Sequence, residues 1–114
     1  MRPLAFLAIA TGLLLSACAL PAPPALQARL PADAVLVGEQ HDAPEHQELH
    51  RQAVQSLADR GALAAVALEM AEQGVSTATL PRDAPEAAVR TALLWNDEAW
   101  PWTAYGPAVM AAVR

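Results

Sequence analysis

The chain contains no lysine. Its seven basic residues are all arginine and face twelve acidic residues, which gives a formal net charge of −5. Because nucleic-acid binding depends on clustered basic side chains that neutralise phosphates, no nucleic-acid partner is expected. Cys18 is the only cysteine, so an internal disulfide is excluded. Aromatic residues make up only 4% of the chain, so the few that are present supply nearly all of its aromatic surface.

No apolar run reaches the roughly 20 residues that a membrane-spanning helix requires. The apolar run from Leu4 to Leu15 follows a single positive charge at Arg2, and small residues come after it. This pattern predicts a secretory signal peptide over residues 1–17.

The end of this segment, Leu15-Ser16-Ala17-Cys18, resembles the lipobox of bacterial lipoproteins. We therefore expect cleavage before Cys18 and acylation of that cysteine, with palmitate as a typical acyl group. Several acyl chains anchor firmly because each buried methylene contributes about 0.8 kcal/mol. Ala19, rather than Asp, favours the outer membrane of a bacterial cell envelope. The alternative is an ordinary export signal with an incidental cysteine.

Residues 19–32 are rich in proline and alanine, so residues 18–32 are predicted to form a lipidated tether. The domain would then span residues 33–114, a marginal size for one hydrophobic core.

A strand–helix–strand unit is predicted at the start of this domain. The run Ala34–Val37 ends at Gly38, and a second apolar run spans Ala64–Leu68. Between them, helical spacing of apolar residues predicts a helix from Pro44 to Arg60, with Asp42 as a candidate N-cap. Continuous apolar strands indicate an α/β fold with a parallel-rich βαβ sheet and flanking helices.

Two further helices are expected, over Pro85–Leu94 and from Ala108 to Val113. Two parallel strands cannot cover both of their own faces, and the second helix is still apolar at Val113. We therefore expect the chain to be the amino-terminal part of a larger domain.

Both predicted strands end in a carboxylate, Glu39 and Glu69, at the sheet edge where ligands bind in parallel sheets. His41 follows in the same loop, His46 lies in the first turn of the next helix, and His50 is expected on its solvated face. Such a set can bind a divalent metal, act as a general acid–base pair or ligate haem iron. The spacing matches neither HExxH nor CxxCH, and each side chain alone could serve only the structure.

The aromatic residues Trp95, Trp100, Trp102 and Tyr105 gather in one short stretch. Tryptophans at such positions most often pack a core. Tyr105 lies between Trp-Pro-Trp and Gly-Pro, where a phenol can face a pocket, and phenolate is one of the axial ligands of haem iron.

Several blocks together resemble the ChaN family of haem-binding lipoproteins. They are VLVGEQHD at residues 35–42, His46-Gln47, ALEM at 67–70, Leu94-Trp95, and WPWxxYxP at 100–107. The resemblance runs from Asp33 to the last residue. Gly38-x-x-His41 also resembles the GxxH motif of the wider Tiki superfamily. One departure is Ala71, where a phenylalanine usually follows the LEM block.

The resemblance implies a membrane-anchored protein that binds haem in haem or iron uptake. It favours a binding protein over an enzyme. A homodimer is possible, and the oligomeric state stays open. It implies His41 or Tyr105 as ligands of the haem iron. The remaining pocket residues would be Glu39, Glu69, His46 and Trp102. The alternative is a Tiki-like metal-dependent hydrolase that uses the GxxH motif, with a divalent ion at Glu39, His41 and Glu69.

Overall fold

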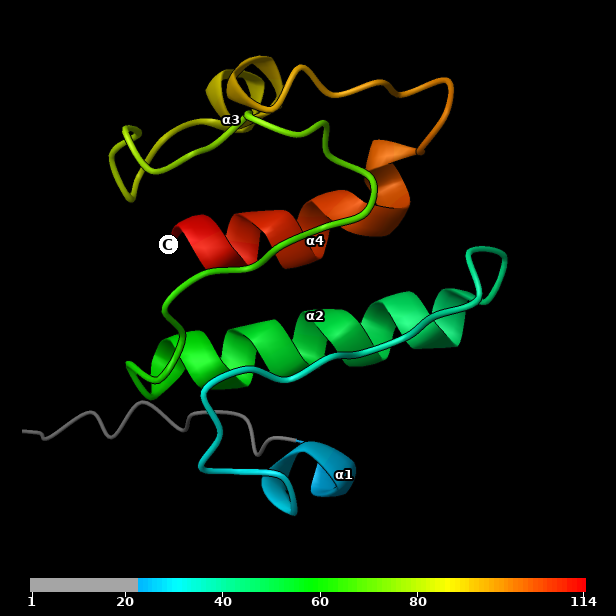
Figure 1. Ribbon diagram of the computed structural model, residues 1–114. Helices are drawn as coiled ribbons and strands as arrows, with labels where there is room; N and C mark the ends of the chain where they lie inside the picture. The colour runs from blue at the N-terminus through cyan, green and yellow to red at the C-terminus, as the bar shows by residue number, and fades with distance from the viewer. Residues whose placement is uncertain (1–22) are drawn as a thin grey trace, which may run out of the picture.

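The computed structural model describes residues 23–114, which form four helices (Figure 1). They are α1 (Pro24–Gln27), α2 (Pro44–Asp59), α3 (Glu86–Ala92) and α4 (Trp102–Val113). The predicted signal peptide and Cys18 lie outside the described residues. Within residues 23–114, no helix combines the length and the apolar character needed to cross a bilayer.

Helix α2 confirms the helix predicted between the two apolar runs. Pro44 occupies its first turn, where the missing N–H is tolerated, and Glu45 lies there too. The residue before the helix is Ala43, which supplies no side-chain cap, so the prediction of Asp42 as N-cap is wrong. Gly61 follows the helix with φ +64, a left-handed conformation that glycine adopts without steric cost.

The predicted parallel sheet is wrong, because no strand occurs among residues 23–114. Residues 34–40 and 62–68 have no regular secondary structure. A strand requires a neighbour that accepts and donates its backbone hydrogen bonds, and an apolar run does not supply that neighbour. Val35, Leu36 and Val37 are exposed, Leu36 by 93%, so these side chains are not buried as strand residues of a covered sheet would be.

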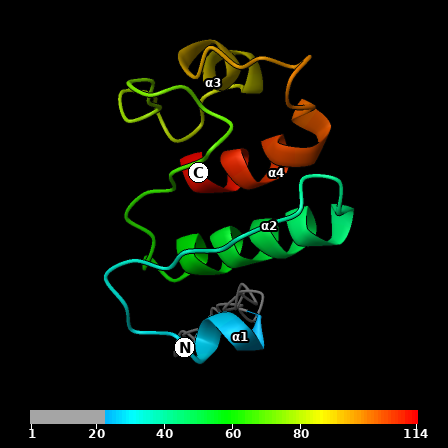
Figure 2. The same cartoon turned by 45° about the vertical axis from the view of Figure 1, so that its right-hand side comes forward.

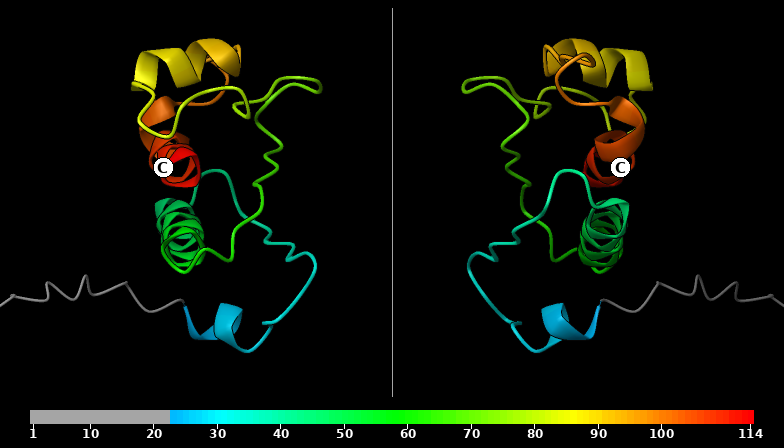
Figure 3. Two further views of the ribbon diagram at one scale, coloured as in Figure 1. Left: turned by 90° about the vertical axis from the view of Figure 1, so that its left-hand side faces the viewer. Right: turned by 90° about the vertical axis from the view of Figure 1, so that its right-hand side faces the viewer.

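Helices α2 and α4 pack side by side and run in the same direction, and α4 lies between α2 and α3 (Figures 1 and 3). Residues 34–40 pass along α2 in the opposite direction, and residues 62–68 lead towards the same end of the molecule (Figures 1 and 2). The ends of both segments therefore approach the amino-terminal ends of α2 and α4.

The hydrophobic core lies between α3 and α4. Val89 of α3 is fully buried, and it packs with Leu93, Trp102 and Val109 in one cluster that also includes Ala84. Partly buried apolar side chains surround this cluster, among them Leu68, Val75, Leu80, Trp95, Met110 and Val113. The core therefore packs together residues that lie between Leu68 and Val113 in the sequence.

Helix α4 begins six residues earlier than the sequence predicts, at Trp102 rather than at Ala108. Asp97 fixes this start, because its Oδ1 accepts the backbone N–H of Trp102 at 2.7 Å. One turn later, Gly106 lies directly against the indole of Trp102, where a Cβ atom would collide with the ring. The absence of a side chain at Gly106 lets Trp102 fold back onto its own helix.

Candidate functional site

Polar and aromatic side chains meet at the end of the molecule where α2 and α4 begin. They come from five places: the loop before α2, the second turn of α2, the turn after residues 62–68, the segment before α4 and the first turn of α4. We call this group the Glu39 cluster, and its members are Glu39, His41, His50, Glu69, Trp100 and Tyr105.

Glu39 lies at the centre of the cluster, and its side chain is only 6% exposed. Its Oε1 is 2.9 Å from Nδ1 of His41. Its Oε2 is 3.0 Å from Nδ1 of His50, although the two groups are not aligned for a hydrogen bond. A buried carboxylate is costly unless it is paired, so the two imidazoles stabilise Glu39 in this position.

His41 has the more exposed of the two imidazoles in the cluster, with 41% of its side chain exposed. Its Nε2 is 3.7 Å from Oε2 of Glu69, a carboxylate that is itself 76% exposed. The edge of Trp100 packs against its ring, with 4.8 Å between the ring centroids. The amide of Gln47 donates to the carbonyl of His41 at 3.0 Å, which holds the backbone of the loop.

Tyr105 lies behind this layer and is buried, with 6% of the residue exposed. Burial raises the pKa of its phenol above the ordinary value of 10.0, and the negative charge of Glu39 and a hydrogen bond with that carboxylate raise it further. A hydrogen bond with Gln47 lowers the pKa of the phenol in part. Trp95 and Trp100 flank the phenol, at centroid distances of 6.2 Å and 5.9 Å.

Two residues predicted for the site lie elsewhere. His46 uses Nδ1 to accept the backbone N–H of Gln40 at 3.0 Å, so it closes the loop before α2. Trp102 is part of the core between α3 and α4, where it stacks edge-on with Trp95 and lies under the guanidinium of Arg90. The structure brings together the other four: Glu39, His41, Glu69 and Tyr105.

The sequence interpretation missed the position of His50, which is 22% exposed beside Glu39 rather than on a solvated face. The helical spacing carried a signal for it, because His50 precedes Ala53 and Val54 by three and four residues and therefore shares their face. The sequence favoured core packing for each tryptophan taken singly, and the family resemblance named Trp102 rather than Trp100 for the pocket. In the structure Trp100 is the one that contacts His41 and Tyr105.

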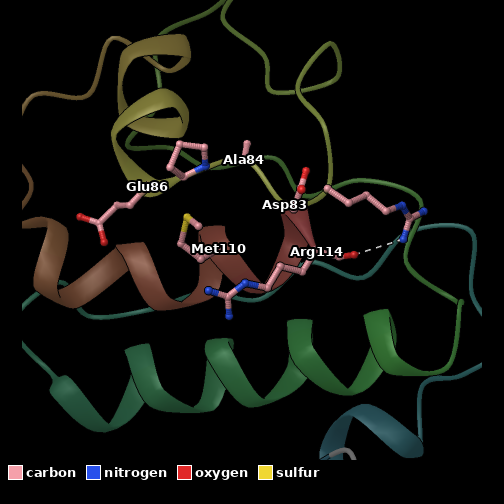
Figure 4. A pocket seen from close by; sticks show the side chains of 7 residues that line it. Asp83, Ala84, Glu86, Met110 and Arg114 are labelled. Atoms are coloured by element: carbon pink, nitrogen blue, oxygen red, sulfur yellow. Dashed lines mark hydrogen bonds between the residues drawn. The ribbon is translucent and has the colours of Figure 1, made fainter.

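Two hollows of the surface lie away from the cluster. A hollow of about 480 Å³ lies between α3 and the end of α4, next to Asp83, Glu86, Met110 and Arg114 (Figure 4). A second of about 200 Å³ lies between α2 and α4, next to Arg51 and Pro107. No group of three or more His, Cys, Asp or Glu side chains in residues 23–114 is arranged to hold a metal ion.

Comparison with known proteins gives one result. The family model described as "haem-binding uptake, Tiki superfamily, ChaN" matches residues 25–114. No curated protein and no solved structure matches the chain. The matched range includes every member of the Glu39 cluster and all of the α3–α4 core, and it spans well over half of the sequence. The chain therefore belongs to the haem-binding uptake family of ChaN proteins in the Tiki superfamily.

Proposed function

We propose that the chain binds haem at the Glu39 cluster and serves haem or iron uptake as a lipid-anchored protein of the bacterial cell envelope. Family membership supports haem as the ligand. We place haem at this cluster because it combines two side chains that can ligate iron, His41 and Tyr105. The rings of Trp95 and Trp100 lie beside them. His41 and Tyr105 each contact the ring of Trp100.

The side chains of the cluster fit haem in their chemistry. Bound haem would supply an iron that an imidazole nitrogen or a phenolate oxygen can ligate. His41 presents an accessible imidazole, and Tyr105 presents a phenol one layer deeper. Trp100 contacts both rings, so it can form a wall for a flat apolar ligand.

Accessibility makes His41 the first candidate for the iron. Its side chain is 41% exposed, whereas Tyr105 is buried and burial raises the pKa of its phenol above the ordinary 10.0. A phenol must lose its proton to ligate iron strongly, so Tyr105 would ligate iron less readily than His41.

A titration of the full-length chain with haemin, in detergent and against a detergent blank, tests the site. We expect a shifted Soret band that is lost in His41→Ala and altered in Tyr105→Phe. His46→Gln is the matched control, because that ring bonds to loop backbone and should leave the band unchanged. If haemin gives the same spectrum with wild type and with the His41→Ala, Tyr105→Phe double variant, the proposal is wrong.

The lipid anchor is proposed from Leu15-Ser16-Ala17-Cys18 alone. Expression of the full chain in a bacterial host with labelled palmitate should label the wild type and place it in the membrane fraction. Cys18→Ser should abolish the label and release the protein from that fraction. An unlabelled wild type would contradict the anchor and leave the haem proposal standing.

A further inference from the structure

His41 lies between two carboxylates, and they compete for the single proton of its neutral ring. Glu39 faces Nδ1 and Glu69 faces Nε2. A neutral imidazole is protonated on one nitrogen and carries a lone pair on the other, and the hydrogen bond made by one nitrogen sets the role of the other. The outcome of this competition therefore decides which nitrogen of His41 can bind a metal.

Distance and burial both favour Glu39. Its Oε1 is 2.9 Å from Nδ1, which is hydrogen-bonding distance for a charged acceptor. Oε2 of Glu69 is 3.7 Å from Nε2, beyond that range. The Glu39 side chain is 6% exposed and that of Glu69 is 76% exposed, so solvent screens the second interaction far more strongly.

We propose that Glu39 is a positioning residue that holds the proton of His41 on Nδ1. The lone pair of Nε2 is then free to ligate a metal. The identity of the ligand at Nε2 rests on the proposed haem function. The state of the ring itself does not depend on it. A carboxylate bonded to the outer nitrogen of a histidine also raises the basicity of the ligating nitrogen, a device found at metal sites in general.

Glu39 has polar neighbours on two further sides. Nδ1 of His50 lies 3.0 Å from its Oε2, and the Tyr105 hydroxyl interacts with the same carboxylate. The amide of Gln47 fixes the carbonyl of His41, so the backbone that carries the ring is fixed as well. The carboxylate and the imidazole therefore have little freedom to exchange partners.

His46, in the first turn of α2, provides an internal comparison. Its Nδ1 accepts the N–H of Gln40, so the proton of its neutral ring must lie on Nε2. The structure thus assigns opposite tautomers to two histidines that are five residues apart. The two rings should be distinguishable in one spectrum of one sample.

Nitrogen-15 NMR of the histidine side chains in the full-length, haem-free chain tests the assignment. The measurement is made at about pH 8.5, where an ordinary histidine with a pKa of about 6.5 is neutral. We expect the Nδ1–H tautomer for His41 and the Nε2–H tautomer for His46, with signals assigned through His41→Gln and His46→Gln. A wild-type His41 protonated on Nε2 would overturn the proposal.

Glu39→Gln and Glu69→Gln form the matched pair of variants. The first replaces a pure acceptor with an amide that can also donate, so the Nε2–H form of His41 should become populated. The second should leave the tautomer as in the wild type. If Glu69→Gln changes the tautomer and Glu39→Gln does not, Glu69 is the positioning residue and the proposal is wrong.

Haemin affinity links the ring to the function. Loss of such a supporting carboxylate typically weakens metal affinity about 10- to 100-fold. We expect this loss for Glu39→Gln and a smaller one for Glu69→Gln, whose carboxylate lies beyond hydrogen-bonding distance of His41. Haemin binding that is equally tight in wild type and Glu39→Gln would overturn the positioning role and leave the proposed function intact. The expected tautomer in a wild type that does not bind haemin would overturn the proposed function instead.

Discussion

Trp100 and Trp102 are separated by one proline, yet they belong to two regions with different construction. Trp102 is buried in the α3–α4 core among apolar side chains. Trp100 packs against His41 and Tyr105 in the Glu39 cluster, where the partners are charged or polar. Asp97 and the turn before α4 separate the two rings by fixing the helix start at residue 102.

The two regions hold together through different interactions. In the core, apolar area removed from water supplies the stability, and it is not directional. In the cluster, one buried carboxylate is matched to particular imidazole nitrogens, and His41 remains 41% exposed. Changes in the core should therefore affect the free energy of unfolding first, whereas changes in the cluster should affect ligand binding first.

The largest contrast is expected between alanine substitutions of the two tryptophans. Trp102→Ala should lower the free energy of unfolding by about 3–5 kcal/mol, because a large buried side chain leaves a cavity. Trp100→Ala should cost much less, because this residue lies at the partly exposed cluster. Urea denaturation followed by circular dichroism measures both, and equal losses would show that the two regions are one core.

Two glycine substitutions sharpen the same comparison. Gly106→Ala places a Cβ against the Trp102 indole, and such overpacking costs about 1–3 kcal/mol. Gly38→Ala, at the edge of the cluster, has no atom within 4 Å of the added Cβ and should leave the unfolding free energy nearly unchanged. The same denaturation experiment applies, and a stable Gly106→Ala variant would contradict the packing of Trp102 onto its own helix.

An alkaline titration addresses the cluster, because Tyr105 is the only tyrosine of the chain. Its pKa is raised in the folded state, so the folded protein holds this proton more tightly than the unfolded chain does. Linkage then predicts that the stability due to Tyr105 is fully present below about pH 10 and is lost as pH rises through the folded pKa.

Tyrosinate absorbance against pH measures this shift directly, and urea denaturation at each pH measures its consequence. Tyr105→Phe should remove this part of the alkaline loss. Glu39→Gln should move the absorbance midpoint to lower pH, because it removes a negative charge beside the phenol. An absorbance midpoint that is the same in the wild type and in Glu39→Gln would show that Glu39 and Tyr105 do not interact.

The smallest effect is expected at the boundary between the regions. The hydrogen bond from the Trp102 N–H, followed by the nearby Arg90, lowers the pKa of Asp97 below its ordinary 3.8. The corresponding stability is present above pH 3.8 and is lost as pH falls through the lowered pKa. Asp97→Asn should abolish this acid dependence, whereas Arg90→Gln should reduce it only in part. Acid titrations of unfolding would contradict the assignment if Arg90→Gln had the larger effect.

The sequence predicted α2 well because its signals are local. Pro44, the apolar spacing and Gly61 each act within one or two turns of the helix, and the structure places all three as expected. The predicted strands failed for the opposite reason. An apolar run such as residues 34–37 indicates a preference for extended backbone, but a sheet depends on a partner that lies far away in sequence or is absent.

For the site, the sequence indicated a meeting of Glu39, His41 and Glu69, and the structure brings them together without a sheet. The loops that follow the two extended segments still converge at the ends of α2 and α4 (Figure 1). The separation of Trp100 from Trp102 was not predictable, because it depends on the single turn at which α4 begins. That start is set by a hydrogen bond that the Asp97 side chain accepts from the Trp102 N–H, and hydrophobic periodicity carries no signal for such a bond.

The three tryptophans form one connected series of rings together with Tyr105. Trp95 stacks edge-on with Trp102 at 5.0 Å, and its indole N–H donates to the carbonyl of Trp100 at 2.8 Å. Every tryptophan of the protein belongs to this series, whose far end touches the ring of His41. Intrinsic fluorescence is therefore a built-in optical reporter. A coloured macrocycle bound beside His41 would quench it by energy transfer, and variants that keep one tryptophan would show how far along the series the quenching extends.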